Sequence, residues 1–289
     1  MPTVRREPSH RRYLMCPPEH FDVVYEINPW MDASVPVQRD RALAQWERLV
    51  ETYRSLGHQV DVLDPQPGLP DMVFAANGST VVDGTVLTAR FANPERAAEA
   101  DHHHNWHQSH STELGWRRIA RPTYINEAEG DFAVAGDVVL AGHGFRTDPR
   151  GHRELADLID LPVIGLRLID PRFYHLDVAL TVLDDTPGAA EIAWYPGAFS
   201  AGSQATVRRL FPHAIEVDER DALVLGLNAV SDGLHVMLPS AATGFAEQLS
   251  RRGYTPVGID LAELLKGGGS VKCCTQELRV VPALLPTAA

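Results

Sequence analysis

Short apolar runs and amphipathic stretches alternate along this chain in a repeating order. Each repeat has two β-rich runs joined by a turn, then a stretch with helical periodicity, then one more short apolar run. We therefore expect a hairpin, a helix and a strand in each unit, with units spaced by roughly 50 residues. The predicted hairpins are 73–91, 132–140, 174–195 and 223–238, the helices 94–114, 149–159, 200–210 and 241–252, and the closing strands 118–120, 162–168, 213–217 and 255–259.

A fifth unit is expected to be shared between the two ends of the chain. The opening segment supplies a strand at 21–27, a helix at 37–56 and a strand at 59–63, and a last strand at 270–281 would return to pair with it. Such pairing closes a ring and removes exposed strand edges. An ordinary α/β sheet has the same alternation, but a doubly wound parallel sheet would not begin its units with hairpins. We predict one α/β domain over residues 1–289.

Composition narrows the class of protein. Hydrophobic residues make up 44% and charged residues 22% of the 289 residues, as in ordinary globular proteins. The formal net charge of -12 argues against binding to nucleic acid or to an anionic membrane. No apolar run reaches the length of a membrane span, and the arginine-rich start lacks the apolar region of a secretory signal. Three cysteines indicate free thiols in a reducing compartment, so we expect a cytoplasmic protein.

The ring predicts where the chemistry lies. If the first strand of every unit points at a common axis, polar residues at the same place in successive units meet in one pocket. The residues at these places are Asn77, the Glu127–Asp131 cluster, His175 with Asp177, Asn228 and Cys273.

Cys273 follows three consecutive glycines, Gly267 to Gly269. Without Cβ atoms the backbone can approach another group closely or adopt a positive φ. A thiol just past such a turn is a candidate nucleophile. The alternative is a flexible turn before a core strand, with Cys273 and Cys274 as small buried hydrophobes.

His175 and Asp177 are two apart in a predicted strand, which would put both on one face. A lone histidine is more often a core or surface residue, but a carboxylate on the same face and a downstream thiol favour function. Glu127, Glu129 and Asp131 lead into an apolar strand, where carboxylates are costly unless they bind a cation; the alternative is a solvated turn. Together these groups suit attack of a thiolate on the carbon of a flat cation such as a guanidinium, with the imidazole moving protons.

These motifs, together with Gly144-Phe145-Arg146-Thr147, resemble those of the guanidino-group-modifying (amidinotransferase, or pentein) superfamily. Its members include dimethylargininase, arginine deiminase, arginine dihydrolase and amidinotransferases. The resemblance extends over nearly the whole chain. It implies a five-bladed α/β propeller with pseudo-five-fold symmetry, built from ββαβ-type units, and a cysteine hydrolase that uses no cofactor and no metal.

The resemblance also implies roles for single residues. Cys273 would be the nucleophile, His175 the general acid and base, and Glu127 the carboxylate that grips the guanidinium and orients the imidazole, with Glu129 as the alternative. The residues expected to bind substrate are Asp177, Asn77, Asp131, Asn28 and, as clamps for the α-carboxylate, Arg90 and Arg146. Asn77 stands where arginine deiminases carry aspartate, a departure that disfavours simple arginine deimination.

Our leading hypothesis is therefore a dimethylargininase that converts Nω,Nω-dimethylarginine to citrulline and dimethylamine through a covalent thiouronium intermediate. Arginine deiminase or arginine dihydrolase is the second hypothesis, and an amidinotransferase or a non-catalytic arginine-binding propeller the third. The partner would be a small guanidino amino acid, and a homo-oligomer is compatible with the sequence. The histidine-rich stretch 102–110 is interpreted as a solvated helix face, with a metal site as the alternative.

Overall fold

The computed structural model describes residues 6–279, which form five sheets of three strands each. In order around the ring, the strands are β15 (Gln276–Glu277), β1 (Arg12–Met15) and β2 (Gln59–Val62); β3 (Ser79–Val82), β4 (Thr85–Thr88) and β5 (Arg118–Ala120); β6 (Phe132–Ala135), β7 (Val138–His143) and β8 (Val163–Arg167); β9 (Leu180–Asp184), β10 (Glu191–Trp194) and β11 (Ile215–Glu216); and β12 (Val230–Ser231), β13 (His235–Pro239) and β14 (Thr255–Ile259).

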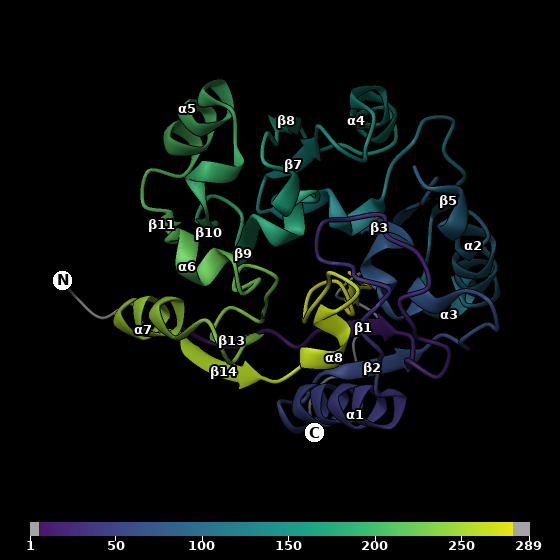
Figure 1. Ribbon diagram of the computed structural model, residues 1–289. Helices are drawn as coiled ribbons and strands as arrows, with labels where there is room; N and C mark the ends of the chain where they lie inside the picture. The colour runs from purple at the N-terminus through teal and green to yellow at the C-terminus, as the bar shows by residue number, and fades with distance from the viewer. Residues whose placement is uncertain (1–5, 280–289) are drawn as a thin grey trace.

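In every sheet a helix, or a pair of helices, connects the second strand to the third. These helices are α1 (Arg39–Ser55), α2 (Glu99–Ser109) with α3 (Ser111–Leu114), α4 (Pro149–Ala156), α5 (Ala201–Leu210) and α7 (Thr243–Arg251). Two short helices lie between consecutive sheets, α6 (Glu219–Ala222) between β11 and β12 and α8 (Ala262–Leu265) between β14 and β15. Figure 1 shows α1, α2, α4, α5 and α7 at the periphery, around the five sheets. Among the helices of residues 6–279, none combines the length and the apolar run that a bilayer span requires.

Every sheet has the same topology, which confirms the predicted five-bladed α/β propeller. The middle strand runs antiparallel to the inner strand and parallel to the outer one, as β4 does with β3 and β5. A helix between the middle and outer strands permits the parallel pairing, because parallel neighbours need a long crossover. The predicted turns also occur, with Asp83 and Gly84 at positive φ between β3 and β4.

The ring closes through the two ends of the chain. β15 pairs antiparallel with β1, with Tyr13 opposite Glu277 and Leu14 opposite Gln276. The predicted closure is therefore correct, but the predicted strand 21–27 is wrong, because that segment is an irregular loop and β1 lies earlier in the chain. The predicted last strand is also too long: residues 271–274 form a turn and only Gln276–Glu277 pair, while positions 280 and 281 lie outside the described residues.

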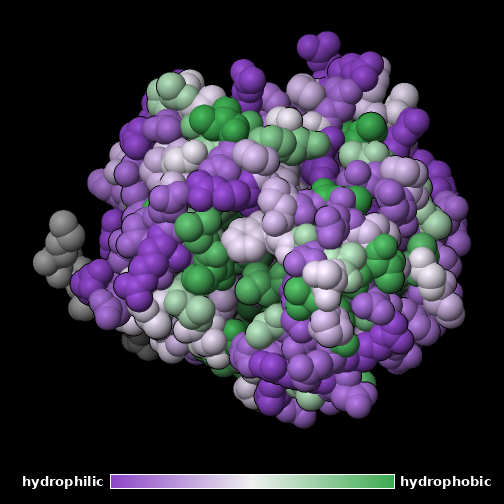
Figure 2. Space-filling view, in the orientation of Figure 1, coloured by the Kyte–Doolittle hydropathy of each residue, from purple (hydrophilic) through white to green (hydrophobic). Residues whose placement is uncertain are grey.

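Apolar side chains between helices and sheets form the core. On α1, Trp46, Leu49, Val50 and Tyr53 are buried at the i, i+3, i+4, i+7 spacing of an amphipathic helix. The inner strand of each sheet lies next to the axis of the ring. Figure 2 shows the molecule in the orientation of Figure 1, with a mostly hydrophilic rim and apolar side chains gathered towards the centre. The packing of helices on sheets thus arranges the loops that enter the inner strands around the axis.

Candidate active site

Most of the predicted site residues lie in or next to the turns that precede the inner strands, whereas Asn28, Arg90 and Arg146 lie elsewhere. Short 3₁₀ turns at Ala75–Asn77, Ala128–Gly130 and Leu176–Val178 lead into β3, β6 and β9. The expectation that His175 and Asp177 lie on a strand is therefore wrong: they lie at a 3₁₀ turn, and β9 begins only at Leu180. Both side chains are nevertheless buried, since each turn enters the centre of the ring.

His175 and Glu127 form a pair at the bottom of the site. The imidazole Nε2 lies 2.9 Å from Glu127 Oε2, and Arg146 Nη1 donates to the same oxygen at 3.0 Å. Glu127 is fully buried, and its other oxygen accepts the backbone N–H of Ala92 at 3.0 Å. Burial raises the pKa of this carboxyl group, but the hydrogen bond to His175 and the charge of Arg146 outweigh that effect and hold the pKa well below its usual range. Glu127 is therefore an ionised partner that orients the imidazole.

Cys273 lies in the turn that follows the glycines and is 2% exposed. Its Sγ lies 3.2 Å from Asp177 Oδ2 and accepts a hydrogen bond from Asn228 Nδ2 at 3.1 Å. Burial, together with the charge of Asp177, raises the pKa of the thiol. Burial likewise raises the pKa of Asp177 to about 6. Within the part of the chain that the structure describes, the thiol shares no hydrogen bond with His175.

Asp131 connects the blade of β6–β8 with the blade of β9–β11. Its Oδ2 accepts the Thr147 hydroxyl at 2.6 Å, and its Oδ1 accepts the backbone N–H of Leu176 at 3.0 Å. Burial raises the pKa of Asp131. Because Leu176 lies between His175 and Asp177, Asp131 fixes the turn that carries both.

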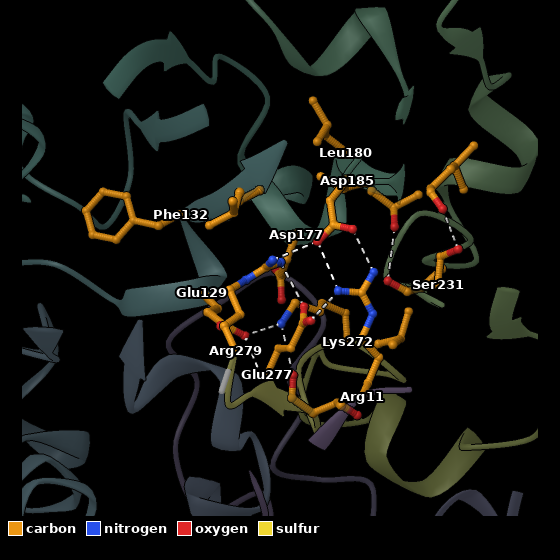
Figure 3. A pocket seen from close by; sticks show the side chains of 18 of the residues that line it. Arg11, Glu129, Phe132, Asp177, Leu180, Asp185, Ser231, Lys272, Glu277 and Arg279 are labelled. Carbon is orange, nitrogen blue, oxygen red and sulfur yellow. Dashed lines mark hydrogen bonds and ion pairs between the residues drawn. The ribbon is translucent and has the colours of Figure 1, made fainter. Parts of the chain in front are cut away.

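Glu129 lines a cavity on the axis of the ring and pairs with groups other than His175. Its Oε2 accepts Lys272 Nζ at 2.5 Å and the backbone N–H of Glu277 at 3.0 Å. The geometry therefore favours Glu127 over Glu129 as the partner of the imidazole. Figure 3 shows side chains that line this cavity, with the ion pair between Glu129 and Lys272 drawn as a dashed line.

The charged groups of this axial cavity pair mainly with one another. Arg11 Nη2 lies 2.7 Å from Asp185 Oδ1, and Arg279 Nη2 lies 2.8 Å from Glu277 Oε2. The cavity lining includes Asp177 but neither Cys273 nor His175. The basic side chains of the lining, Arg11, Lys272 and Arg279, are thus each paired with a carboxylate, whereas Asp177 Oδ1 has no hydrogen-bond partner among the described residues.

Asn77 belongs to a buried network that sequence reasoning found only in part. Its Nδ2 donates to the carbonyl of Glu127 at 3.3 Å, and its Oδ1 accepts Arg96 Nη1 at 3.0 Å. Arg96 also pairs with Glu99 at 2.8 Å and donates to the carbonyl of Asp71 at 3.2 Å. These contacts hold Asn77 at both ends of its amide.

Asp71 was missed by the motif search. It is 1% exposed, its Oδ2 accepts Tyr25 OH at 2.9 Å, and burial raises its pKa against the lowering effect of Arg96. The available signal was a carboxylate inside the apolar run from Leu69 to Phe74, which is costly without a partner.

Asn28 packs on the glycine turn. Its Nδ2 donates to the carbonyl of Gly267 at 3.1 Å, and a Cβ on Gly268 would lie 2.5 Å from its Oδ1. Gly268 has φ +85°, and a Cβ on Gly269 would lie 2.4 Å from Phe74 Cε1. Glycine is therefore required here for close packing and for the left-handed backbone. The turn is closely packed, so the alternative of a flexible turn does not apply.

The two predicted carboxylate clamps have different surroundings. The Arg146 side chain is only 6% exposed; besides Glu127, it donates to the carbonyl of Ile27 at 2.7 Å, and its guanidinium lies 4.9 Å from the ring centroid of Tyr174. Arg90 is exposed and donates to the carbonyl of Thr123. Both existing partners are protein groups, so the clamp role of either arginine stays a prediction.

The histidine-rich helix is not a solvated face. His103 and His107 are fully buried, and burial lowers the pKa of each to about 3. A Cβ on Gly78 would lie 2.0 Å from His103 Nδ1, and His107 Nε2 lies 2.6 Å from Ser79 Oγ. The neutral rings thus pack against the segment after Asn77. Among residues 6–279, no three His, Cys, Asp or Glu side chains come together as a metal-ligand group.

Sequence comparison gives the same family over most of the chain. The family described as N,N dimethylarginine dimethylhydrolase, eukaryotic, matches residues 23–183. An N(G),N(G)-dimethylarginine dimethylaminohydrolase from Mycobacterium tuberculosis is 54% identical over 274 residues, which are 95% of this chain and 88% of that protein. The bifunctional arginine dihydrolase/ornithine cyclodeaminase ArgZ from Synechocystis is 36% identical over 95% of this chain, which spans only 38% of ArgZ.

Solved structures of the same family have the same fold as this chain. The N-terminal domain of ArgZ, an arginine dihydrolase crystallised as a cysteine-to-serine variant with substrate, has a TM-score of 0.86 at 33% identity and covers 93% of this chain and 98% of that one. A dimethylarginine dimethylaminohydrolase adduct shares the fold at 18% identity and a TM-score of 0.72, over 93% of this chain and 99% of that one. Sequence and structure together show that the chain belongs to the dimethylarginine dimethylaminohydrolase and arginine dihydrolase family of the pentein superfamily.

Proposed function

We propose that the chain hydrolyses Nω,Nω-dimethylarginine to citrulline and dimethylamine. The observation that carries the proposal is a thiol, an imidazole and an excess of buried carboxylates around one centre, in a chain 54% identical to a dimethylarginine dimethylaminohydrolase. The carboxylates are Asp71, Glu99, Glu127, Asp131 and Asp177, each at most 5% exposed. Arg96 and Arg146 are the buried arginines paired with members of this set, so a bound guanidinium supplies missing positive charge.

Two of these carboxylates have an oxygen ready for the substrate. Asp71 Oδ1 and Asp177 Oδ1 are buried and lack a hydrogen-bond partner among the described residues. Buried polar atoms are rarely left unpaired, so such oxygens suit the N–H groups of a cation. Burial raises the pKa of both groups, and a bound guanidinium favours their ionised forms.

The proposed reaction uses Cys273 as the nucleophile and His175 as the general acid and base. The Cys273 thiolate forms an S–C bond to the guanidinium carbon, and the C–N bond to dimethylamine breaks as His175 protonates the departing nitrogen. His175 then takes a proton from water, the oxygen bonds to the same carbon, and the S–C bond breaks to give citrulline and the thiolate. Glu127 keeps the imidazole oriented through both steps, because it holds Nε2 at 2.9 Å.

Arginine dihydrolase is the second candidate. It is favoured by the 36% identity to ArgZ and by a TM-score of 0.87 with the product-bound N-terminal domain of that arginine dihydrolase. The two reactions differ in product, since a dihydrolase would release ornithine and ammonia from plain arginine.

Product analysis tests the proposal. Purified protein is incubated with dimethylarginine, monomethylarginine, arginine and agmatine, and mass spectrometry follows citrulline, ornithine and dimethylamine. We expect citrulline and dimethylamine from dimethylarginine, loss of both with Cys273→Ser, and retention with Cys274→Ser, a matched change at the neighbouring buried thiol. Ornithine from arginine, with no turnover of dimethylarginine, would select the second candidate.

A further inference from the structure

Asn228 is a buried residue that the repeat pattern places at the common centre, but neither the family motifs nor the proposed chemistry gives it a role. It is fully buried in the turn that leads into β12, in the blade of β12–β14. Its backbone N–H donates to the carbonyl of Leu225 at 2.9 Å, and its own carbonyl accepts the N–H of Lys272 at 3.3 Å. Its backbone thus fixes it against the turn that carries the nucleophile.

The side-chain amide of Asn228 uses all of its hydrogen-bonding positions. Oδ1 accepts the backbone N–H groups of Ser270 at 3.0 Å and Cys273 at 3.1 Å. Nδ2 donates to the carbonyl of Asp177 at 3.1 Å and to Cys273 Sγ at 3.1 Å. An asparagine amide has two donors and two acceptor lone pairs, so none is left over.

These partners also fix which way the amide points. The two backbone N–H groups are donors and must face the amide oxygen, because a flipped amide would bring donors against donors. The NH₂ group therefore faces the sulfur. The second polar side chain at the sulfur is Asp177, whose carboxylate can only accept when ionised.

The sulfur thus has one neighbour suited to each of its protonation states. A neutral thiol donates its proton towards Asp177 Oδ2, whereas a thiolate needs donors and repels that carboxylate. Asn228 Nδ2 is the side-chain donor that meets this need at 3.1 Å. Resting on the proposed function, which requires a thiolate, we propose that Asn228 stabilises the ionised form of Cys273 and positions its turn for attack.

The pH dependence of Cys273 alkylation tests the proposal without any substrate. Intact protein is treated with iodoacetamide across a pH series, and the modification of the Cys273 peptide is measured by mass spectrometry. Asn228→Asp keeps an oxygen for the two backbone N–H groups but replaces the donor to sulfur with an acceptor. We expect the alkylation midpoint to rise by at least one pH unit.

Asn126→Asp is the matched control. Asn126 is also fully buried, and its Oδ1 accepts the N–H of Ala128 at 3.2 Å in the turn before β6, but it does not touch the sulfur. We expect this variant to lose stability while its alkylation midpoint stays at the wild-type value. An Asn228→Asp midpoint equal to that of the wild type would overturn the proposal and leave Asn228 as an anchor of the turn alone.

Two further measurements keep the outcomes separate. If Asn228→Asp does not fold, Asn228→Ser, too short to span to the sulfur, must give the same upward shift. If the wild type fails to hydrolyse dimethylarginine while the midpoint still shifts, the proposed function fails and the role of Asn228 stands. In an enzyme that does turn over, kcat should fall roughly 10- to 100-fold at neutral pH with little change in KM, as for a group acting on the nucleophile alone.

Discussion

Gly130 offers a direct test of the central packing, because it lies under two site residues at once. A Cβ at this position would lie 2.3 Å from Asn77 Nδ2 and 3.2 Å from His175 Nδ1. Real Cβ atoms essentially never approach a heavy atom closer than 3.0 Å, so the Asn77 amide must retreat in Gly130→Ala. The backbone of Gly130 is not in the positive-φ region, and the substitution therefore acts through this contact and not through local strain.

The amide has little freedom to retreat. Arg96 holds its oxygen at 3.0 Å, and the carbonyl of Glu127 holds its nitrogen at 3.3 Å. Movement breaks one of these bonds, and a hydrogen bond to a charged group contributes about 1.5–3 kcal/mol. Overpacking of a buried site typically costs about 1–3 kcal/mol as well. A displacement of the imidazole near 1 Å would lower kcat by roughly 100-fold.

The assay compares kcat with dimethylarginine and urea unfolding of Gly130→Ala and Gly202→Ala. Gly202 lies on the exposed start of α5, where a Cβ meets nothing within 4 Å. We expect Gly202→Ala to keep wild-type activity and to be neutral or slightly stabilised, and Gly130→Ala to lose both activity and stability. Wild-type turnover and stability in Gly130→Ala would refute the packing of Asn77 and His175 over this glycine.

Three further substitutions probe the buried charges and the glycine turn. Glu127→Gln leaves Arg146 without its charged partner and should lower the free energy of unfolding by about 3–5 kcal/mol at neutral pH. Because folding depresses the pKa of Glu127, the difference between variant and wild type should shrink as pH falls below about 4.5. As a control, Asp101→Asn, in an exposed ion pair, should change urea unfolding little at neutral or at acidic pH. Folding raises the pKa of Asp177 from its ordinary 3.8 to about 6, so ionisation of Asp177 lowers stability by roughly 3 kcal/mol as pH rises through this range. Asp177→Asn should therefore be inactive yet more stable than the wild type at pH 7.5, with no gain in stability at pH 4. A variant less stable than the wild type at pH 7.5 would contradict this reasoning. Gly268→Ala, at φ +85°, should lower stability by about 1–2 kcal/mol and slow Cys273 alkylation, and an unchanged melting temperature would show that the turn tolerates a side chain.

The peripheral elements could be predicted from sequence because local patterns determine them. The strand Arg118–Ala120 and the strand Thr255–Ile259 have their predicted bounds, and the helix predicted at 37–56 extends over Arg39–Ser55. The segment 21–27 was misjudged for a physical reason. Phe21 and Val23 are buried like alternate residues of a strand, but they pack from a loop whose Tyr25 hydroxyl and Ile27 carbonyl bind groups at the site. An alternating hydrophobic pattern indicates which side chains are buried, but burial alone does not show that the backbone pairs with another strand.

The contacts inside the site could be predicted only in outline. The repeat indicated that polar residues on the first strands of successive units meet at one centre, but not that they lie in turns before those strands or which carboxylate faces the imidazole. Glu127 and Glu129 are two residues apart, and the 3₁₀ turn between them directs one to His175 and the other to Lys272. Such a turn has no periodicity long enough to be recognised in sequence.

The ring explains why such different residues can share one centre. Each blade delivers one turn to the axis, and neighbouring turns bind each other: Asp131 fixes the turn after His175, Asn77 binds the carbonyl of Glu127, and Asn228 holds the turn of Cys273. A substitution in one turn should therefore alter the next blade before it alters distant ones. The geometry of the nucleophile depends on the closure between β15 and β1, because that pairing begins three residues after Cys273. The position of the nucleophile therefore depends on the same strand pairing that closes the ring.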